Sequence, residues 1–162
     1  MQHKPILFVD VDGVISLWGF DHDARPPGAF TTVDGIVHFL SAAAGEHLLE
    51  LGEHFDLVWC TGWKDRANDY LPHALGLPGP LPHLEFGTPA ERTAHWKLDA
   101  VRAYAEDRPA AWIDDAFDAS CHAWAAERGA PTLLVATEPP TGLQAVHADR
   151  LRRWAGALPL TS

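Results

Sequence analysis

The sequence predicts an α/β fold built on a mainly parallel sheet. Short apolar runs, typical of strands buried on both faces, recur along the chain, stretches of helical length separate them, and the runs end in polar or glycine residues. The four strands are expected at 5–11, 56–62, 110–115 and 131–137. Because strands and helices alternate, as in consecutive βαβ units, we expect a three-layer α/β domain.

Five stretches between and after these runs have helical length. They cover 41–54, 64–75, 91–107, 118–128 and 143–157. Ser41 is placed to cap the first helix, while Thr88, Pro89 and Glu91 supply a cap, a first-turn proline and an acid for the third. Pro131 stops the fourth helix before the last strand. Apolar residues at helical spacing in the fifth predict a face packed on the domain.

Two stretches, 16–32 and 77–89, lack clear periodicity and are rich in proline and glycine, so we expect loops or short hairpins there. Neither approaches the roughly 50 residues that an independent domain needs. The length of 162 residues fits one domain covering 1–162.

Composition limits the classes of function. With 47% hydrophobic and 21% charged residues the chain can form a core, and no apolar run approaches the ~18–20 residues that span a bilayer. Without a targeting signal, we expect a cytoplasmic protein with no membrane partner. Twelve basic against 22 acidic residues give a net charge of −10, which argues against bulk nucleic-acid binding but leaves room for one terminal phosphate in a cleft. Two cysteines, expected to be reduced, form neither a disulfide framework nor a zinc motif.

The strongest chemical feature is a pair of carboxylates, Asp10 and Asp12, at the carboxyl end of the first expected strand. Ligands of open α/β sheets bind at that end of the strands. If the chain is extended there, the two side chains point the same way and converge, and Gly13 permits a sharp exit. Mg²⁺, which prefers oxygen ligands and works with substrate phosphates, would offset their repulsion. Taken alone, the pair also fits a strand that ends in solvent.

Two further groups of polar residues follow strands of the expected sheet. Asp114 and Asp115 close the third strand and Asp118 follows a helical turn later, so one of them can complete a metal site, although acids before a helix also act as caps. Thr61 and Gly62 end the second strand and precede a helix, which places a hydroxyl and backbone amides where a phosphate binds.

Lys97 lies in the expected helix 91–107, from which it can reach a phosphate, although a helical lysine is more often on the surface. In chain order, Asp-x-Asp-Gly-Val, Thr, Lys and Asp-Asp resemble the four motifs of the haloacid dehalogenase (HAD) superfamily, most of whose members are Mg²⁺-dependent phosphatases. The resemblance covers nearly the whole chain and implies a Rossmann-like HAD domain. Both points at which members insert a cap are short here, which implies no large cap domain.

The resemblance implies a role for each matching residue. Asp10 would be the nucleophile that forms an aspartyl-phosphate, and Asp12 would protonate the leaving oxygen and then activate water. Thr61, Gly62 and Lys97 would hold the phosphoryl oxygens. Superfamily members that cleave carbon–halogen bonds or pump ions lack the second aspartate, so a phosphatase is favoured.

The cofactor implied by the resemblance is Mg²⁺. Its ligands would be Asp10, the backbone carbonyl of Asp12, and one or both of the acidic pair. We favour Asp115 as the direct or water-mediated ligand and Asp114 as its support, although spacing leaves that assignment open.

A closer resemblance lies in Trp59-Cys-Thr-Gly-Trp63, Trp112-Ile-Asp-Asp115 and the segment 142–147 with Trp154. These resemble the HAD domain of Swiss Army Knife RNA-repair proteins, for which trimming of phosphates from RNA ends is inferred. The expected substrate is therefore a phosphorylated small molecule or a nucleic-acid end. A regulatory domain that binds Mg²⁺ and phosphate without turnover, and a phosphotransferase, remain alternatives, and an oligomer is left open.

Several aromatic and basic side chains fall near the expected edge of the site. Trp18, Phe20 and Trp63 suit either stacking on a base or core packing, of which packing is the more common. Lys64 and Arg66 suit either steering of an anionic substrate or a solvated helix face.

Overall fold

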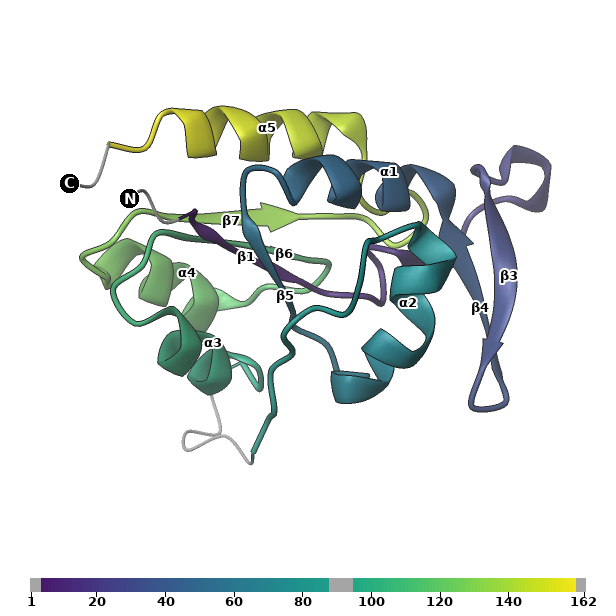
Figure 1. The fold of residues 1–162 in the computed structure, drawn as a ribbon, viewed down its shortest axis with the longest axis horizontal. Coiled ribbons are helices and arrows are strands. Elements are labelled where there is room, and N and C mark those ends of the chain that lie inside the picture. The colour runs from purple at the N-terminus through teal and green to yellow at the C-terminus, as the bar shows by residue number, and fades with distance from the viewer. Residues whose placement is uncertain (1–3, 88–94, 160–162) are drawn as a thin grey trace.

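The structure, a computed structural model, describes residues 4–87 and 95–159. Its centre is a four-stranded sheet with the strand order β5-β1-β6-β7, in which every neighbouring pair is parallel (Figure 1). The strands are β1 (Ile6–Val9), β5 (Asp56–Trp59), β6 (Ala110–Asp114) and β7 (Thr132–Ala136). All four expected strands are present, and their carboxyl ends lie along one edge of the sheet.

Helices cover both faces of this sheet, as the three-layer prediction requires. They are α1 (Ala42–Leu51), α2 (Ala67–Leu75), α3 (Leu98–Ala105), α4 (Ala119–Glu127) and α5 (Ala145–Gly156). Figure 1 shows α1 and α5 on one face and α3 and α4 on the other. Successive residues of a strand point to opposite faces, so Leu7 and Val9 pack in the core under α1, α2 and α5, and Ile6 and Phe8 pack under α3 and α4.

Helix starts follow local hydrogen bonding. The Ser41 hydroxyl accepts from the Ala44 amide at 3.1 Å, which confirms the expected cap of α1. Asp118 caps α4 by accepting from the backbone N–H groups of Ser120 and Cys121, so this acid acts as a cap. Within the described part of the chain, no helix is long and apolar enough to cross a membrane.

The third helix begins later than expected. Residues 88–94, which include the Thr88 to Glu91 capping signal, lie outside the described residues, and α3 begins at Leu98. His95 and Trp96 precede the helix, and Lys97 is its N-cap rather than a residue inside it. Two hydrogen bonds hold this segment: the Lys97 backbone N–H donates to His95 Nδ1 at 3.1 Å, and the His95 backbone N–H donates to the distant Ser120 Oγ at 2.9 Å.

A second, antiparallel sheet follows the first strand; loops or short hairpins are expected only over 16–32, and part of this sheet lies beyond that stretch. Its order is β2-β4-β3, formed by β2 (Ser16–Leu17), β3 (Gly28–Val33) and β4 (Ile36–Ser41), with a short 3₁₀ helix, η1 (His22–Ala24), between β2 and β3. Asp34 and Gly35 join β3 to β4 with φ of 50° and 81°. An Asp-Gly pair between β-branched and aromatic residues is a strong hairpin signal that the sequence contained. This small sheet lies beside the main one and is no large cap (Figure 1).

The segment 77–87 contains no strand. A single parallel bridge joins His83 to Trp59 of β5, and the Leu84 backbone N–H donates to the Trp59 carbonyl at 3.0 Å. Before α2, residues Lys64–Arg66 form a 3₁₀ helix, η2, so the expected helix 64–75 divides into two helical segments.

The turn after β1 depends on a close backbone contact. The backbone N–H groups of Val14, Ile15 and Ser16 all donate to the Val11 carbonyl, and the Leu143 N–H donates to the Val14 carbonyl at 2.9 Å. The neighbouring Gly142 has a φ of +62°, and a Cβ there would collide with the Val14 carbonyl oxygen. Glycine is therefore required where the β7–α5 connection passes this turn.

Replacement of Gly142 by alanine is expected to lower the free energy of unfolding by about 2–5 kcal/mol, because the left-handed backbone costs about 1–2 kcal/mol and the collision about 1–3 kcal/mol. Gly76→Ala is the matched control. Gly76 also has a positive φ, of +74°, but a Cβ there meets no atom within 4 Å. This control should lose only about 1–2 kcal/mol in urea denaturation. Equal losses would contradict the importance of the Val14 contact.

Candidate functional site

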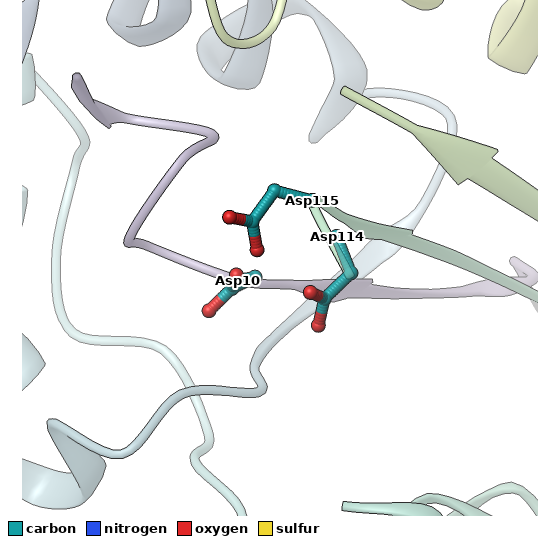
Figure 2. Close-up of side chains that lie close together, drawn as sticks. All are labelled: Asp10, Asp114 and Asp115. Carbon is teal, nitrogen blue, oxygen red and sulfur yellow. The ribbon is translucent and has the colours of Figure 1, made fainter. Parts of the chain in front are cut away.

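Three carboxylates meet where two central strands end. Asp10 directly follows β1, Asp114 is the last residue of β6, and Asp115 follows it. One oxygen of each lies within 4.8 Å of the others, and Figure 2 shows the three side chains gathered at this edge. Asp10 and Asp114 are buried and Asp115 is partly buried. The parallel pairing of β1 with β6 brings these residues together across about a hundred residues of chain.

Lys97 is the buried cation of this cluster. Its Nζ lies 2.9 Å from Asp10 Oδ1 and 2.7 Å from Asp114 Oδ2. Asp114 accepts two further hydrogen bonds, from Trp112 Nε1 at 3.2 Å and from the Ala116 backbone N–H at 3.1 Å. Both oxygens of Asp114 are therefore engaged by protein donors. When the three acids are ionised, the positive charge of Lys97 leaves two negative charges uncompensated. The two positive charges of a divalent cation would balance them.

Burial and mutual repulsion control the ionisation of the cluster. Burial raises the pKa of Asp10 from 3.8 to about 8; the Lys97 ammonium opposes this rise and the Asp114 charge adds to it. Burial also raises the pKa of Asp115. For Lys97, burial acts to lower the pKa, but the Asp10 and Asp114 carboxylates together raise it above its usual value. Proximity of acids and a lysine at such a depth is typical of active and metal-binding sites.

The Asp12 side chain lies outside this cluster. The expected convergence of Asp10 and Asp12 assumed an extended chain, but β1 ends at Val9 and the turn onto the Val11 carbonyl follows at once. The Asp12 carboxylate is about half exposed, and its Oδ2 accepts a hydrogen bond from Trp63 Nε1 at 3.2 Å. Its contacts therefore differ from those of the three clustered acids.

Gly13 allows the turn after β1 to approach the acidic cluster. Its φ is +81°, and a Cβ at this position would collide with the side chain of Asp115. The Thr137 hydroxyl, just after β7, donates to the Gly13 carbonyl at 2.8 Å and fixes the turn from the other side. The backbone at Gly13 therefore lies against Asp115.

Thr61 and Gly62 lie at the same edge of the sheet. The Cys60 backbone N–H donates to the Val9 carbonyl at 2.8 Å, which holds the end of β5 against the end of β1. Thr61 is buried, and its Oγ1 accepts from the Trp63 backbone N–H at 3.2 Å. Gly62 is exposed, so its backbone is accessible. Thr61 and Gly62 thus lie at the carboxyl edge of the main sheet, where the sequence predicts them.

His95 supports Lys97 and was missed by sequence reasoning. Because its Nδ1 accepts from the Lys97 N–H, its Nε2 carries the proton and donates to the Ala116 carbonyl at 2.8 Å. The ring therefore joins the lysine segment to the turn that follows Asp114. No spacing rule points to this histidine. Trp112, also missed, has a signal: it stands two residues before Asp114 on the same strand, and such residues share a face.

Two of the aromatic candidates of the edge are packed, and one of the basic candidates is paired within the protein. Trp63 is only 8% exposed, so it is a packed residue rather than a platform for a base, and Phe20 packs on Phe39 with ring centroids 5.0 Å apart. Trp18 is half exposed. Arg66 NH1 lies 2.5 Å from Asp34 Oδ2 in the hairpin turn, so this arginine pairs within the protein.

Both cysteines are free and buried. Burial raises the pKa of the Cys60 thiol, and it raises that of Cys121 to about 11. Cys60 therefore behaves as a core residue.

Comparison with known families assigns the chain. The model of the HAD domain in Swiss Army Knife RNA repair proteins matches residues 6–148. The chain belongs to this family. A search of curated proteins finds no match. This HAD domain therefore has the α/β fold of its superfamily without a large cap, and its buried acidic cluster is compatible with a bound metal ion.

Replacement of Lys97 by methionine tests the charge balance of the cluster. Because the variant leaves two buried carboxylates without their cation, the free energy of unfolding measured in chelator should fall by about 3–5 kcal/mol. The double variant Lys97→Met with Asp114→Asn should regain part of this loss, since it removes one of the unpaired charges. A loss below about 1 kcal/mol in the single variant would contradict the role of the ion pairs.

Proposed function

We propose that this HAD domain is a Mg²⁺-dependent phosphomonoesterase that works through an aspartyl-phosphate on Asp10. The observation that carries the proposal is the buried Lys97 ammonium between Asp10 and Asp114, beside Asp115 and at the edge where Thr61 and Gly62 lie. Acids for a metal and donors for a phosphate then meet at the end of the same sheet.

The residues present fit a magnesium ion. Every donor in the cluster is a carboxylate oxygen, the preferred ligand type of Mg²⁺, and two negative charges remain after Lys97 is counted. Asp10 and Asp115 would hold the ion with the backbone carbonyl of Asp12, and Asp114 would act as support, because its two oxygens already accept three protein hydrogen bonds. When bound, the ion offsets negative charge on the phosphoryl oxygens.

The protein groups perform two half-reactions. In the first, an Asp10 oxygen attacks phosphorus, the bond to the leaving oxygen breaks, and Asp12 gives that oxygen a proton. In the second, Asp12 takes a proton from water, whose oxygen attacks phosphorus and releases inorganic phosphate and the Asp10 carboxylate. The Thr61 hydroxyl, the Gly62 backbone N–H and the Lys97 ammonium hold the phosphoryl oxygens throughout.

The substrate class proposed is a phosphorylated small molecule or the phosphate end of a nucleic acid. Between β1 and α1 the chain carries only the small sheet β2-β4-β3 and no large cap, which supports access for the end of a chain. The family takes its name from RNA-repair proteins, which supports an RNA end as one candidate. The net charge of −10 favours recognition of a single terminus over binding along a strand.

The test is steady-state hydrolysis of 4-nitrophenyl phosphate, nucleotides and 5′- or 3′-phosphorylated RNA, with Mg²⁺ and with chelator. Turnover should require Mg²⁺, and Asp10→Asn should lower kcat by a factor on the order of 10³ or more, because the nucleophile is lost. Asp69→Asn, on the exposed side of α2, is the matched control and should retain activity.

Other outcomes separate the alternatives. Mg²⁺ binding without turnover on any of these substrates would contradict the enzyme and favour a regulatory binding domain. Product that forms faster than free phosphate would indicate transfer to an acceptor other than water. Turnover that survives in Asp10→Asn would refute the assignment of the nucleophile.

A further inference from the structure

The Asp12 carboxylate accepts a hydrogen bond from the indole N–H of Trp63. Trp63 Nε1 donates to Asp12 Oδ2 at 3.2 Å, while the rest of the ring is buried in the core that includes Val11 and Val14. The Asp12 side chain itself is 49% exposed. An exposed carboxylate in a turn would otherwise sample several rotamers. This hydrogen bond therefore restricts the side chain of Asp12, the proposed site acid that lies outside the cluster of Asp10, Asp114 and Asp115.

His38 supports the indole from the second sheet. Its ring centroid lies 4.7 Å from that of Trp63, and the two planes meet at 58°. Its Nδ1 forms a hydrogen bond of 2.9 Å with the Ser16 hydroxyl and lies 4.0 Å from Asp12 Oδ1. Ser16 is in turn bridged to Asp12 through the backbone. The imidazole is thus fixed against Trp63 on the Oδ1 side of Asp12.

The two supporting residues come from segments that are tied together. Trp63 precedes η2, and His38 lies on β4. The hairpin turn between β3 and β4 is joined to η2 by the Arg66–Asp34 ion pair, and to the following helix α2 by a hydrogen bond from the Tyr70 hydroxyl to Asp34 Oδ1 at 3.3 Å. The small antiparallel sheet therefore has a direct structural link to the position of Asp12.

We propose that Trp63 is a positioning residue that orients Asp12 for proton transfer to the leaving oxygen, with His38 fixing the indole. This inference rests on the proposed function. The Trp63 N–H occupies Oδ2 whether Asp12 is ionised or protonated, since a carbonyl oxygen accepts as a carboxylate oxygen does. The proton that moves is therefore carried on Oδ1. A general acid that loses its orientation loses part of its rate contribution, while the nucleophile and the phosphate donors are unaffected.

The test uses leaving groups that differ in their need for a proton. The alkoxide that leaves an alkyl phosphate is a strong base and needs a proton from Asp12. The 4-nitrophenolate that leaves 4-nitrophenyl phosphate is a weak base and needs this proton much less. Trp63→Phe keeps an aromatic ring and removes the N–H. We expect kcat/KM, which reports the steps up to release of the leaving group and so excludes the second half-reaction, to fall on the order of 10-fold or more for the alkyl substrate and less than about 3-fold for 4-nitrophenyl phosphate.

Trp59→Phe is the matched control. Trp59 is another buried tryptophan whose Nε1 donates to a side chain, Asn68 Oδ1 at 2.9 Å, but its partner is not Asp12. A structural effect of losing an indole should lower both rates equally in this variant. In an Asp12→Asn background, Trp63→Phe should cause no additional difference between the two substrates, because the two residues act as a unit.

His38→Ala removes the ring that packs against Trp63 and leaves the indole in place. It is the second test variant, used if Trp63→Phe does not fold. It should also slow the alkyl substrate more than the aryl one. Equal losses of kcat/KM for both substrates in the Trp63 and His38 variants would overturn the positioning role while leaving the phosphatase intact. Absence of Mg²⁺-dependent, Asp10-dependent turnover in the unaltered protein would instead refute the proposed function, and the positioning role with it.

Discussion

The rest of the site depends on one buried cation, the ammonium of Lys97 between Asp10 and Asp114. Two acids at this depth would repel each other and lose their charges to protons, and the lysine alone would be neutralised by burial. When they are held together, the Lys97 ammonium opposes the rise in the pKa of Asp10, the two carboxylates raise the pKa of Lys97, and the contacts fix the ends of β1 and β6 relative to the start of α3. Trp112 and His95 matter for the same reason: they hold Asp114 and the Lys97 segment in the geometry in which the ion pairs form.

The main sheet and its polar edge were predictable because their causes are local in the sequence. Apolar runs of strand length, each followed by the residues that make the edge, indicate both the strands and the side of the sheet on which Asp10, Thr61 and Asp114 lie. The Ser41 cap was predictable in the same way. The Asp34-Gly35 turn was equally local, but its signal was overlooked among the prolines and glycines of the preceding stretch.

What failed depended on contacts between distant residues. The helical length of 91–107 and the capping signal before it placed Lys97 inside a helix, whereas the hydrogen bonds of His95 to Ser120 and Ala116 hold this segment as a turn before α3. The direction of Asp12 depended on where β1 stops, which the Val11 carbonyl decides by accepting three backbone N–H groups. Trp63 and His38, which hold Asp12, come from two other parts of the chain. No spacing along the sequence could reveal these contacts.

The burial of Cys60 and Cys121 has a practical consequence. A thiol with a raised pKa and no solvent access carries almost no thiolate at neutral pH, so maleimide and iodoacetamide reagents should leave both native cysteines unmodified in the folded protein. A fluorophore or spin label can then be attached at one added surface cysteine without first removing the natural ones. The hairpin that carries His38 is a suitable place for such a label, since its movement relative to η2 would report directly on whether the two segments stay joined.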